Sequence, residues 1–246
     1  MTRKRHACVT IPPYAVAMDQ MNRFAVYFAP RPGAFADATA ALLGWDSVSG
    51  LSVPQPALPG LHAPLSELTA EPRKYGFHGT IRAPFRLAPS LSPDAVVHTV
   101  RALSTGLSPA VCDGLRVENL HGFLALIPSG DLADLNHLAA KVVRATNPLR
   151  APLSPEERSR RRPESLSDHQ RALLDEWGYP HVMDEFHFHL TLTNRLAPQH
   201  AENTAAALSA YLAPVLPSPF RVDDLCLFGE DAQGLFHLLH RFPLGG

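Results

Sequence analysis

The feature that most constrains this chain is a short residue pattern that occurs twice. Residues 186–193 alternate aromatic or aliphatic side chains with His or Thr, and residues 77–82 repeat the arrangement. A period of two predicts a strand with one apolar face and one polar face. On each polar face a His is followed two residues later by a Thr: His78 with Thr80, and His189 with Thr191.

The segments that follow the two motifs also match each other. After a predicted helix come Leu-Arg-Val-Glu-Asn-Leu at 115–120 in one half and Phe-Arg-Val-Asp-Asp-Leu at 220–225 in the other. A glycine-led apolar run follows each, at 122–126 and 234–238. This recurrence indicates an internal duplication. Duplicated units usually pack about a pseudo-twofold axis, which predicts a central cleft with His78 opposite His189.

The remaining patterns predict an α+β fold with mainly antiparallel sheets. Alternation and turn residues predict strands, and caps with helical spacing predict helices. The residues at 46–72 are rich in Pro, Ser and Gly and predict a long loop. The expected strands are 24–28, 73–85, 114–120, 122–127, 186–193, 220–228 and 235–239; the expected helices are 34–43, 92–103, 131–146 and 201–212.

The chain divides into an extension, one domain and an insertion. Residues 1–21 differ from the rest and predict a non-native or disordered N-terminal extension, with Met18 or Met21 as the initiator. Residues 22–246 predict a single bilobal domain. Within it, 151–185 forms an insertion-like helical block whose two helices begin with capping boxes, at Ser154 and at Ser167.

Composition limits the classes of function. The net charge is −1, which argues against an extended nucleic-acid surface but allows a local basic pocket. The three cysteines are far apart and form no CxxC pair, which favours a reducing cytoplasm. No apolar run approaches the ~20 residues of a membrane span. We therefore expect a cytoplasmic monomer with no membrane partner.

Two histidines that face one cleft suit a displacement in which one group accepts a proton and another donates one. Histidine titrates near ~6.5 when unperturbed, so it can act as base or acid at neutral pH. The hydroxyls of Thr80 and Thr191 can donate hydrogen bonds to a phosphate oxygen as charge develops there. Such a mechanism needs no metal and no other cofactor.

The paired runs His78-Gly79-Thr80-Ile81 and His189-Leu190-Thr191-Leu192 resemble the two-histidine phosphoesterase superfamily. Three longer runs, at 75–85, 150–166 and 177–193, are similar to its phosphonate-operon branch. The resemblance implies a duplicated, two-lobed α+β fold with a pseudo-twofold axis, and metal-independent cleavage of cyclic phosphates or phosphodiesters. This chain has Arg82 and His187 where members of that branch often have Lys and Arg.

Further residues are candidates for binding the substrate, and each has a structural alternative. His187 has metal-ligand spacing with His189, but the sequence shows no clear third ligand motif, so we read it as lining the cleft or its rim. An arginine run in the insertion would bind a second phosphate, or it is a solvated helix end. The expected substrate-binding residues are Arg82, Lys74, His187, Thr193, Arg160, Arg161 and Arg162.

The sequence therefore predicts a metal-independent cyclic phosphodiesterase that acts on a small phosphorylated molecule, such as one from phosphonate breakdown. His78 and His189 are the expected acid and base, and Thr80 and Thr191 are their catalytic partners. Two alternatives stay open: an RNA 2′,3′-cyclic phosphodiesterase, and a non-catalytic module that binds phosphate or nucleotide.

Overall fold

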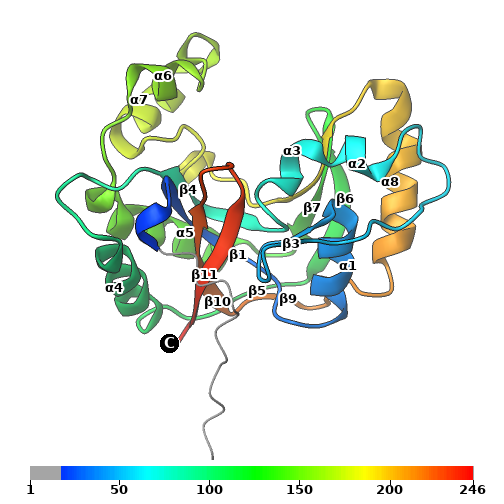
Figure 1. Cartoon of the computed structure of the whole chain (residues 1–246), viewed down its shortest axis with the longest axis horizontal. Helices are drawn as coiled ribbons and strands as arrows, with labels where there is room; N and C mark the ends of the chain where they lie inside the picture. The colour runs from blue at the N-terminus through cyan, green and yellow to red at the C-terminus, as the bar shows by residue number, and fades with distance from the viewer. Residues whose placement is uncertain (1–17, 246) are drawn as a thin grey trace, which may run out of the picture.

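A computed structural model describes residues 18–245 of the chain (Figure 1). Its centre is a seven-stranded antiparallel sheet in the order β11-β10-β1-β4-β8-β7-β6. The strands are β1 Arg23–Phe28, β2 Trp45–Asp46, β3 Leu51–Ser52, β4 Gly79–Phe85, β5 Ala110–Cys112, β6 Gly114–Leu120, β7 Phe123–Ser129, β8 Leu190–Arg195, β9 Phe220–Val222, β10 Asp224–Glu230 and β11 Phe236–Pro243. The helices are α1 Ala34–Leu43, α2 Leu65–Leu68, α3 Ala70–Arg73, α4 Pro93–Ser104, α5 Ala133–Thr146, α6 Pro155–Ser159, α7 Asp168–Trp177 and α8 Pro198–Leu212. The 3₁₀ turns are η1 Met18–Gln20, η2 Asn147–Leu149, η3 Pro163–Ser165 and η4 Met183–Glu185.

The α+β class and the internal duplication are confirmed by the order of the elements. The first half runs β4-α4-β5-β6-β7 and the second runs β8-α8-β9-β10-β11. The hairpin β6–β7 of the first half lies beside the motif strand of the second half, because β7 pairs with β8. The hairpin β10–β11 of the second half lies on the side of β4, because β10 pairs with β1, which is the neighbour of β4. The two motif strands therefore lie side by side at the middle of the sheet, between the two lobes.

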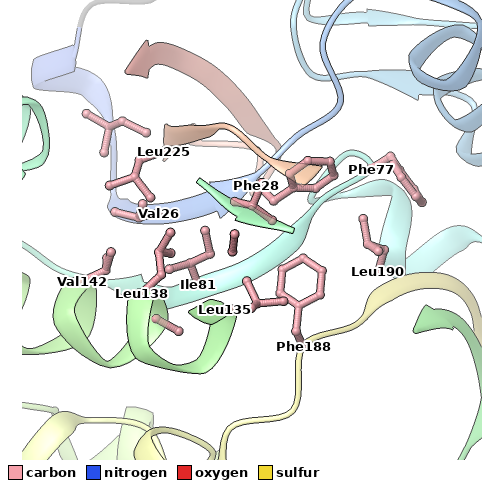
Figure 2. Packing of buried hydrophobic residues seen from close by; sticks show 14 of the residues in the cluster. Val26, Phe28, Phe77, Ile81, Leu135, Leu138, Val142, Phe188, Leu190 and Leu225 are labelled. Atoms are coloured by element: carbon pink, nitrogen blue, oxygen red, sulfur yellow. The ribbon is translucent and has the colours of Figure 1, made fainter. Parts of the chain in front are cut away.

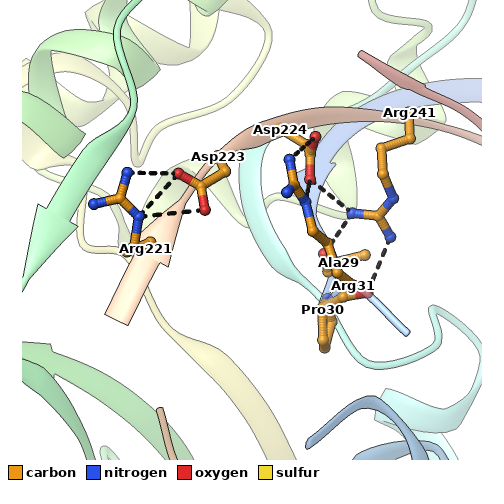
Figure 3. Close-up of polar contacts among 7 residues, drawn as sticks. All are labelled: Ala29, Pro30, Arg31, Arg221, Asp223, Asp224 and Arg241. Carbon is orange, nitrogen blue, oxygen red and sulfur yellow. Dashed lines mark hydrogen bonds and ion pairs between the residues drawn. The ribbon is translucent and has the colours of Figure 1, made fainter. Parts of the chain in front are cut away.

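The register of the duplication differs from the sequence match. Strand β5 pairs with β9 so that Val111 lies opposite Arg221, with Ala110 opposite Val222 and Cys112 opposite Phe220. Because the pairing is symmetric about this residue pair, Val111 of the first half is the structural equivalent of Arg221 in the second. The sequence match instead equates Arg221 with Arg116, which lies five residues after Val111. Equating 116–118 with 221–223 was therefore wrong. Both triplets contain the same kind of local ion pair, Arg116–Glu118 at 2.8 Å and Arg221–Asp223 at 3.0 Å. Figure 3 shows the second of these pairs.

Both motif strands are shorter than their alternation predicted. The first begins at Gly79 instead of residue 73, because α3 and a turn at Gly76 (φ 67°) precede it. The second begins at Leu190 instead of residue 186. The apolar face nevertheless continues outside the ladder, since Phe77 and Phe188 are buried in the main core.

The predicted long loop at 46–72 contains short regular elements, so that prediction was wrong in part. A two-stranded hairpin, β2–β3, opens the segment and two single-turn helices, α2 and α3, close it. Thr69 holds the turn between the helices, because its buried hydroxyl donates to the Leu65 carbonyl at 2.6 Å. Such short elements have no sequence periodicity to detect.

Local end signals explain the helices that were predicted well. Helix α1 has the predicted bounds and ends at Gly44, whose φ of 77° suits glycine. In the insertion, both capping boxes are present: Ser154 and Ser167 accept hydrogen bonds from the backbone N–H of Glu157 and Gln170. Figure 1 shows α6 and α7 projecting at the upper left, far from α8 at the right.

The main core lies between the sheet and its helices. Helices α4 and α5 contact β10, β11 and β4, whereas α8 contacts β6 and β7. Figure 2 shows side chains of α5, among them Leu138 and Val142, beside Val26 of β1 and Ile81 of β4. All four are buried. No helix within residues 18–245 combines the length and the apolar character needed to cross a membrane.

An ion-pair cluster fastens the end of β1 to the β10–β11 hairpin (Figure 3). The carboxylate of Asp224 is 5% exposed and accepts hydrogen bonds from Arg31 at 2.7 and 2.8 Å and from Arg241 at 3.3 Å. Burial alone would raise the pKa of Asp224, but the two arginines lower it below its usual value. Arg241 also donates to the carbonyls of Ala29 and Pro30, so the cluster is structural.

The folded chain begins before the domain bound expected at residue 22. Met18–Gln20 forms η1, and Met21 is 9% exposed within the main core. Residues 1–17 of the expected extension lie outside the described part of the chain.

Candidate active site

The register of the motif strands determines how the two histidines face each other. Gly79 of β4 pairs with Leu190 of β8 in antiparallel orientation. His78 therefore lies opposite Thr191, and Thr80 lies opposite His189. Side chains directly opposite each other share a face with Cβ atoms about 4.5–5.5 Å apart, whereas diagonal pairs such as the two histidines are about 7–8 Å apart. Each histidine thus meets the threonine of the other motif across a pseudo-twofold centre.

The two imidazole rings are held in the same way. Nδ1 of His78 lies 2.9 Å from the carbonyl oxygen of Gly76, and Nδ1 of His189 lies 2.8 Å from that of His187. Because a carbonyl oxygen only accepts, Nδ1 carries the proton in each ring. Nε2 of each neutral ring is therefore the atom left to accept or transfer a proton.

Burial keeps both rings neutral near pH 7. The pKa of His78 is lowered to about 4, chiefly by burial and also by the nearby His189, against a smaller opposing effect of the Gly76 carbonyl. Burial also lowers the pKa of His189; the hydrogen bond to the His187 carbonyl opposes this effect, and the charge of the His187 ring lowers the pKa by a smaller amount. The ring of His78 packs on Tyr27, with the ring centroids 4.1 Å apart.

A hollow of about 390 Å³ opens over this pair of strands. His78, Thr80 and Thr191 line it, and Phe123 on its wall lies 5.8 Å from the ring of His189. The residues that line the hollow are Arg23, Tyr27, Glu71, Pro72, Tyr75, His78, Thr80, Ala83, Pro84, Phe123, Arg161, Tyr179, Thr191, Thr193, Asn194 and Arg195. Within residues 18–245, the hydroxyls of Thr80 and Thr191 form no hydrogen bond with another group of the protein. Both hydroxyls are therefore available to a ligand.

Thr193 lines the same hollow, but its hydroxyl is engaged by the fold. The side chain is 1% exposed, accepts from the Leu124 N–H at 3.0 Å and donates to the Asn194 carbonyl at 2.8 Å. It thus stabilises the β7–β8 connection where the alternation predicted a substrate contact.

Two further expected ligands, Lys74 and Arg82, do not line the cleft. The Lys74 ammonium pairs with Glu71 at 3.0 Å. Lys74 lies at the end of α3, before β4 begins, so the alternation of side chains along a strand does not place it on the same face as His78. Arg82 was expected to share the face of Thr80. The β1–β4 pairing is bulged there: Tyr27 lies opposite Thr80, but Val26 lies opposite Arg82. Val26 points into the core, so the bulge turns Arg82 away from the cleft.

His187 and the arginine run occupy different positions around the site. His187 is exposed beside His189, with its Nδ1 3.1 Å from the Glu185 carbonyl, which fits a rim position. Arg161 lines the cleft and its guanidinium lies 4.8 Å from the centroid of the Tyr179 ring. Arg160 lines an adjoining hollow, and Arg162 lines neither.

The described residues form no group of three or more His, Cys, Asp or Glu side chains arranged to hold a metal ion. The spacing of His187 and His189 therefore finds no third ligand in this part of the chain. The threonine hydroxyls and the histidine ring nitrogens are polar groups at this strand pair.

Sequence reasoning missed several residues of the cleft wall. Tyr27 is fully buried under His78, and its hydroxyl has no hydrogen-bond partner in the described residues. Arg23 lies on the same face of β1 and hydrogen-bonds Glu230. A signal was present in β1, where Phe24, Val26 and Phe28 form one face and Arg23 and Tyr27 the other. Tyr75 and Tyr179 come from loops, where no periodicity marks them.

The sequence profile of a family described as "Protein of unknown function (DUF1045)" matches residues 80–237. The chain belongs to this family. The matched span contains Thr80 of the first motif and all of the second motif.

The chain is also similar to two bacterial proteins, each named "Ribose 1,5-bisphosphate phosphokinase PhnN". The protein from Janthinobacterium sp. (strain Marseille) is 36% identical over 245 residues, covering 96% of this chain and 54% of the relative. That from Laribacter hongkongensis (strain HLHK9) is 32% identical over 213 residues, covering 86% and 49%. The chain thus spans about half the length of these relatives.

Two solved structures are similar at low sequence identity. The protein TT0787 of Thermus thermophilus is 16% identical with a TM-score of 0.45, covering 91% of this chain and 98% of TT0787. A structure described as a phosphoesterase is 11% identical with a TM-score of 0.43, covering 92% and 99%.

Proposed function

We propose that this chain is a cyclic phosphodiesterase that hydrolyses a small phosphorylated compound without a metal. The observation that carries the proposal is the antiparallel juxtaposition of the two His–Thr pairs, in which neither Nε2 atom and neither threonine hydroxyl has a hydrogen-bond partner among residues 18–245. Acid and base catalysts must reach one reacting group by direct or water-bridged hydrogen bonds. A phosphate above the Gly79–Leu190 pair meets both requirements.

The chemistry follows from these groups. His78, the ring with the strongly lowered pKa, is the better general base, because it stays neutral near pH 7. It accepts a proton from a water molecule as that oxygen bonds to phosphorus. His189, protonated when the anionic phosphate is bound, gives its proton to the departing ring oxygen as the P–O bond breaks. Thr80 and Thr191 donate hydrogen bonds to the other phosphate oxygens, where charge develops.

The lowered histidine pKa values predict an acidic pH optimum for kcat/KM. In the free enzyme the base must be neutral, which holds above pH ~4 for His78, and the acid must be protonated, which is lost before pH ~6.5 because the pKa of His189 is lowered. We expect a bell-shaped profile with its maximum below pH 6.5. Steady-state rates from pH 3.5 to 8.5 in constant ionic strength check this expectation. A profile still rising at pH 8 would contradict it.

The relatives' printed name concerns a kinase, but this chain lacks the usual phosphate loop of such enzymes. A Walker-type loop needs a Gly-Lys-Ser or Gly-Lys-Thr sequence, and none of Lys4, Lys74 and Lys141 follows a glycine. The relatives are about twice as long, so the kinase activity fits the part of them that this chain does not match. Their substrate, a phosphorylated ribose, supports a ribose-sized phosphate ester as the substrate class here.

The deciding experiment is a screen of cyclic phosphates with phosphorus NMR detection of the products, in the presence of EDTA. We expect one cyclic signal to convert to a single monoester signal at an unchanged rate when EDTA is added. Loss of activity in EDTA that zinc restores would overturn the metal-independent reaction and favour a site at His187 and His189. Turnover only of RNA ends would favour the RNA enzyme. Binding without turnover of any compound would favour the non-catalytic module.

A further inference from the structure

A second hollow of about 200 Å³ adjoins the histidine cleft, between β4, α6 and the end of α7. It is separated from the cleft only by a common wall, because six residues line both: Arg23, Tyr75, Ala83, Pro84, Arg161 and Tyr179. The two hollows therefore lie next to each other along these residues.

Arg82 forms part of this hollow and is an unusual buried cation. It is 1% exposed, and it donates only to neutral acceptors, the Trp177 carbonyl at 2.9 Å and the Asn147 side chain at 3.4 Å. Its Nε is buried with no hydrogen-bond partner, and no carboxylate pairs with it, within residues 18–245. A buried charge is unfavourable unless an opposite charge compensates it. The fold supplies no such partner from the described residues.

Arg150 places a second positive charge beside the first. Its guanidinium donates to the Asn147 side chain at 3.3 Å and to the Ala151 and Glu176 carbonyls at 3.1 and 3.4 Å, which are again neutral acceptors. Burial and the charge of Arg150 lower the pKa of Arg82 to about 10, so Arg82 stays positively charged at neutral pH. Two neighbouring cations repel each other and together favour an anion between them.

The guanidinium of Arg150 is seated against a glycine that leaves space for it. Gly178 ends α7 at a φ of 76°, and a Cβ atom there would lie 2.9 Å from Cδ and Nε of Arg150. The end of α7 thus positions Arg150 at the hollow through the shape of its C-cap.

The described wall of the hollow has little negative charge to balance these cations. Glu157 is its one carboxylate, and it is bound by Arg86 through two hydrogen bonds of 2.9 Å. Arg23 is already paired with Glu230 outside the hollow. Four arginines of the wall have no ion pair within residues 18–245: Arg82, Arg150, Arg160 and Arg161.

We propose that this hollow is a second anion site, in which Arg82 and Arg150 bind a phosphate group of the same substrate that carries the cyclic phosphate, with Arg161 at the common wall. The inference rests on the proposed function, because it takes the histidine cleft as the reacting site. Guanidinium groups bind phosphate oxygens through paired hydrogen bonds, which suits a terminal phosphomonoester. Thr80, which lines the cleft, and Arg82, which lines the second hollow, are two residues apart on β4, at most about 7 Å along the strand, so the two sites adjoin each other.

The kinetic test compares two substrates that differ by one phosphate: adenosine 2′,3′-cyclic phosphate with and without a 5′-phosphate. We expect Arg150→Gln to raise KM for the 5′-phosphorylated compound about 10–100-fold and to leave the other within about twofold. Arg82→Lys keeps the positive charge but loses the paired hydrogen bonds of the guanidinium group. It is also expected to raise KM for the 5′-phosphorylated compound and to leave KM for the other compound nearly unchanged. Arg158→Gln is the matched control, because Arg158 pairs with Asp175 in the same insertion and lines neither hollow. Equal losses on both compounds, or none on either, would overturn the proposal.

A binding test separates this inference from the proposed reaction. Ribose 5-phosphate, which has no cyclic phosphate, is titrated calorimetrically into the wild-type protein and into the Arg150→Gln and His78→Ala variants. We expect the dissociation constant to rise at least about tenfold in Arg150→Gln and to stay nearly unchanged in His78→Ala. If no cyclic phosphate is hydrolysed but this pattern holds, the reaction fails and the anion site stands. Equal binding by the wild type and Arg150→Gln overturns the site, whatever the turnover.

Discussion

Replacing either His78 or His189 with alanine is expected to reduce turnover of a cyclic phosphate by about 10²–10⁴-fold, with KM changed much less. In the proposed mechanism each Nε2 transfers the proton on its side of the reacting phosphate, because each Nδ1–H is held by a backbone carbonyl. Stopped assays of phosphorus-labelled substrate, with protein folding checked by circular dichroism, measure the effect.

His98→Ala is the control for these variants, because His98 is exposed on α4 and lines neither hollow. It is expected to keep wild-type activity. Retention of more than about a tenth of wild-type turnover by a folded His78→Ala or His189→Ala protein would contradict proton transfer by that ring. A double variant should lose little more than the worse single one, because the two rings act on one displacement.

Gly79→Ala is expected to lower the free energy of unfolding by about 3 kcal/mol or more, at the upper end of overpacking effects. A Cβ atom at residue 79 would lie 2.2 Å from Cζ and 2.6 Å from Cε2 of Phe188. Phe188 is 4% exposed and cannot swing away, because the rings of Phe28 and Phe220 lie 6.3 and 5.9 Å from it. Since Gly79 lies between His78 and Thr80, the clash would also displace the site. Urea unfolding measures the stability change.

Gly106→Ala is the matched control for this prediction. The nearest atom to its added Cβ is a backbone oxygen of Leu103 at 4.0 Å, so the change is expected to be nearly neutral. Adding Phe188→Leu to Gly79→Ala should restore part of the lost stability, because the shorter side chain makes room for the new methyl group. A double variant whose loss equals the sum of the two single losses would mean that the two residues do not compete for the same space.

The closeness of the two motif strands could be predicted from the sequence because a repeated pattern implies a repeated structure. A His and a Thr two residues apart share a strand face by the geometry of the backbone alone. The duplication then required the two strands to meet near a symmetry axis, which the Gly79–Leu190 pair shows. Which side chain faces which was not predictable, because it depends on a register that one residue of slip would change.

Arg82 shows where the alternation of side chains along a strand fails to predict the face on which a residue lies. Its spacing from His78 and Thr80 predicted the same face, but two irregularities in the β1–β4 pairing rotate it toward Trp177 and Asn147. A bulge is created by the pairing of two strands, so neither strand reveals it alone. The anion site proposed for Arg82 and Arg150 therefore became visible only from the tertiary structure.

The sequence by itself determined the features that depend on a few neighbouring residues: the end of α1 at Gly44, the capping boxes at Ser154 and Ser167, and the His–Thr faces. Caps and turns are local because their hydrogen bonds span about four residues, and alternation is local because it follows from the backbone geometry of one strand. Only the tertiary structure decided the rest, including the hydroxyl of Thr193 bound by Leu124, and the wall that joins Tyr27, Tyr75 and Tyr179. Those contacts join residues far apart in the chain, so their geometry depends on how strands and loops pack together.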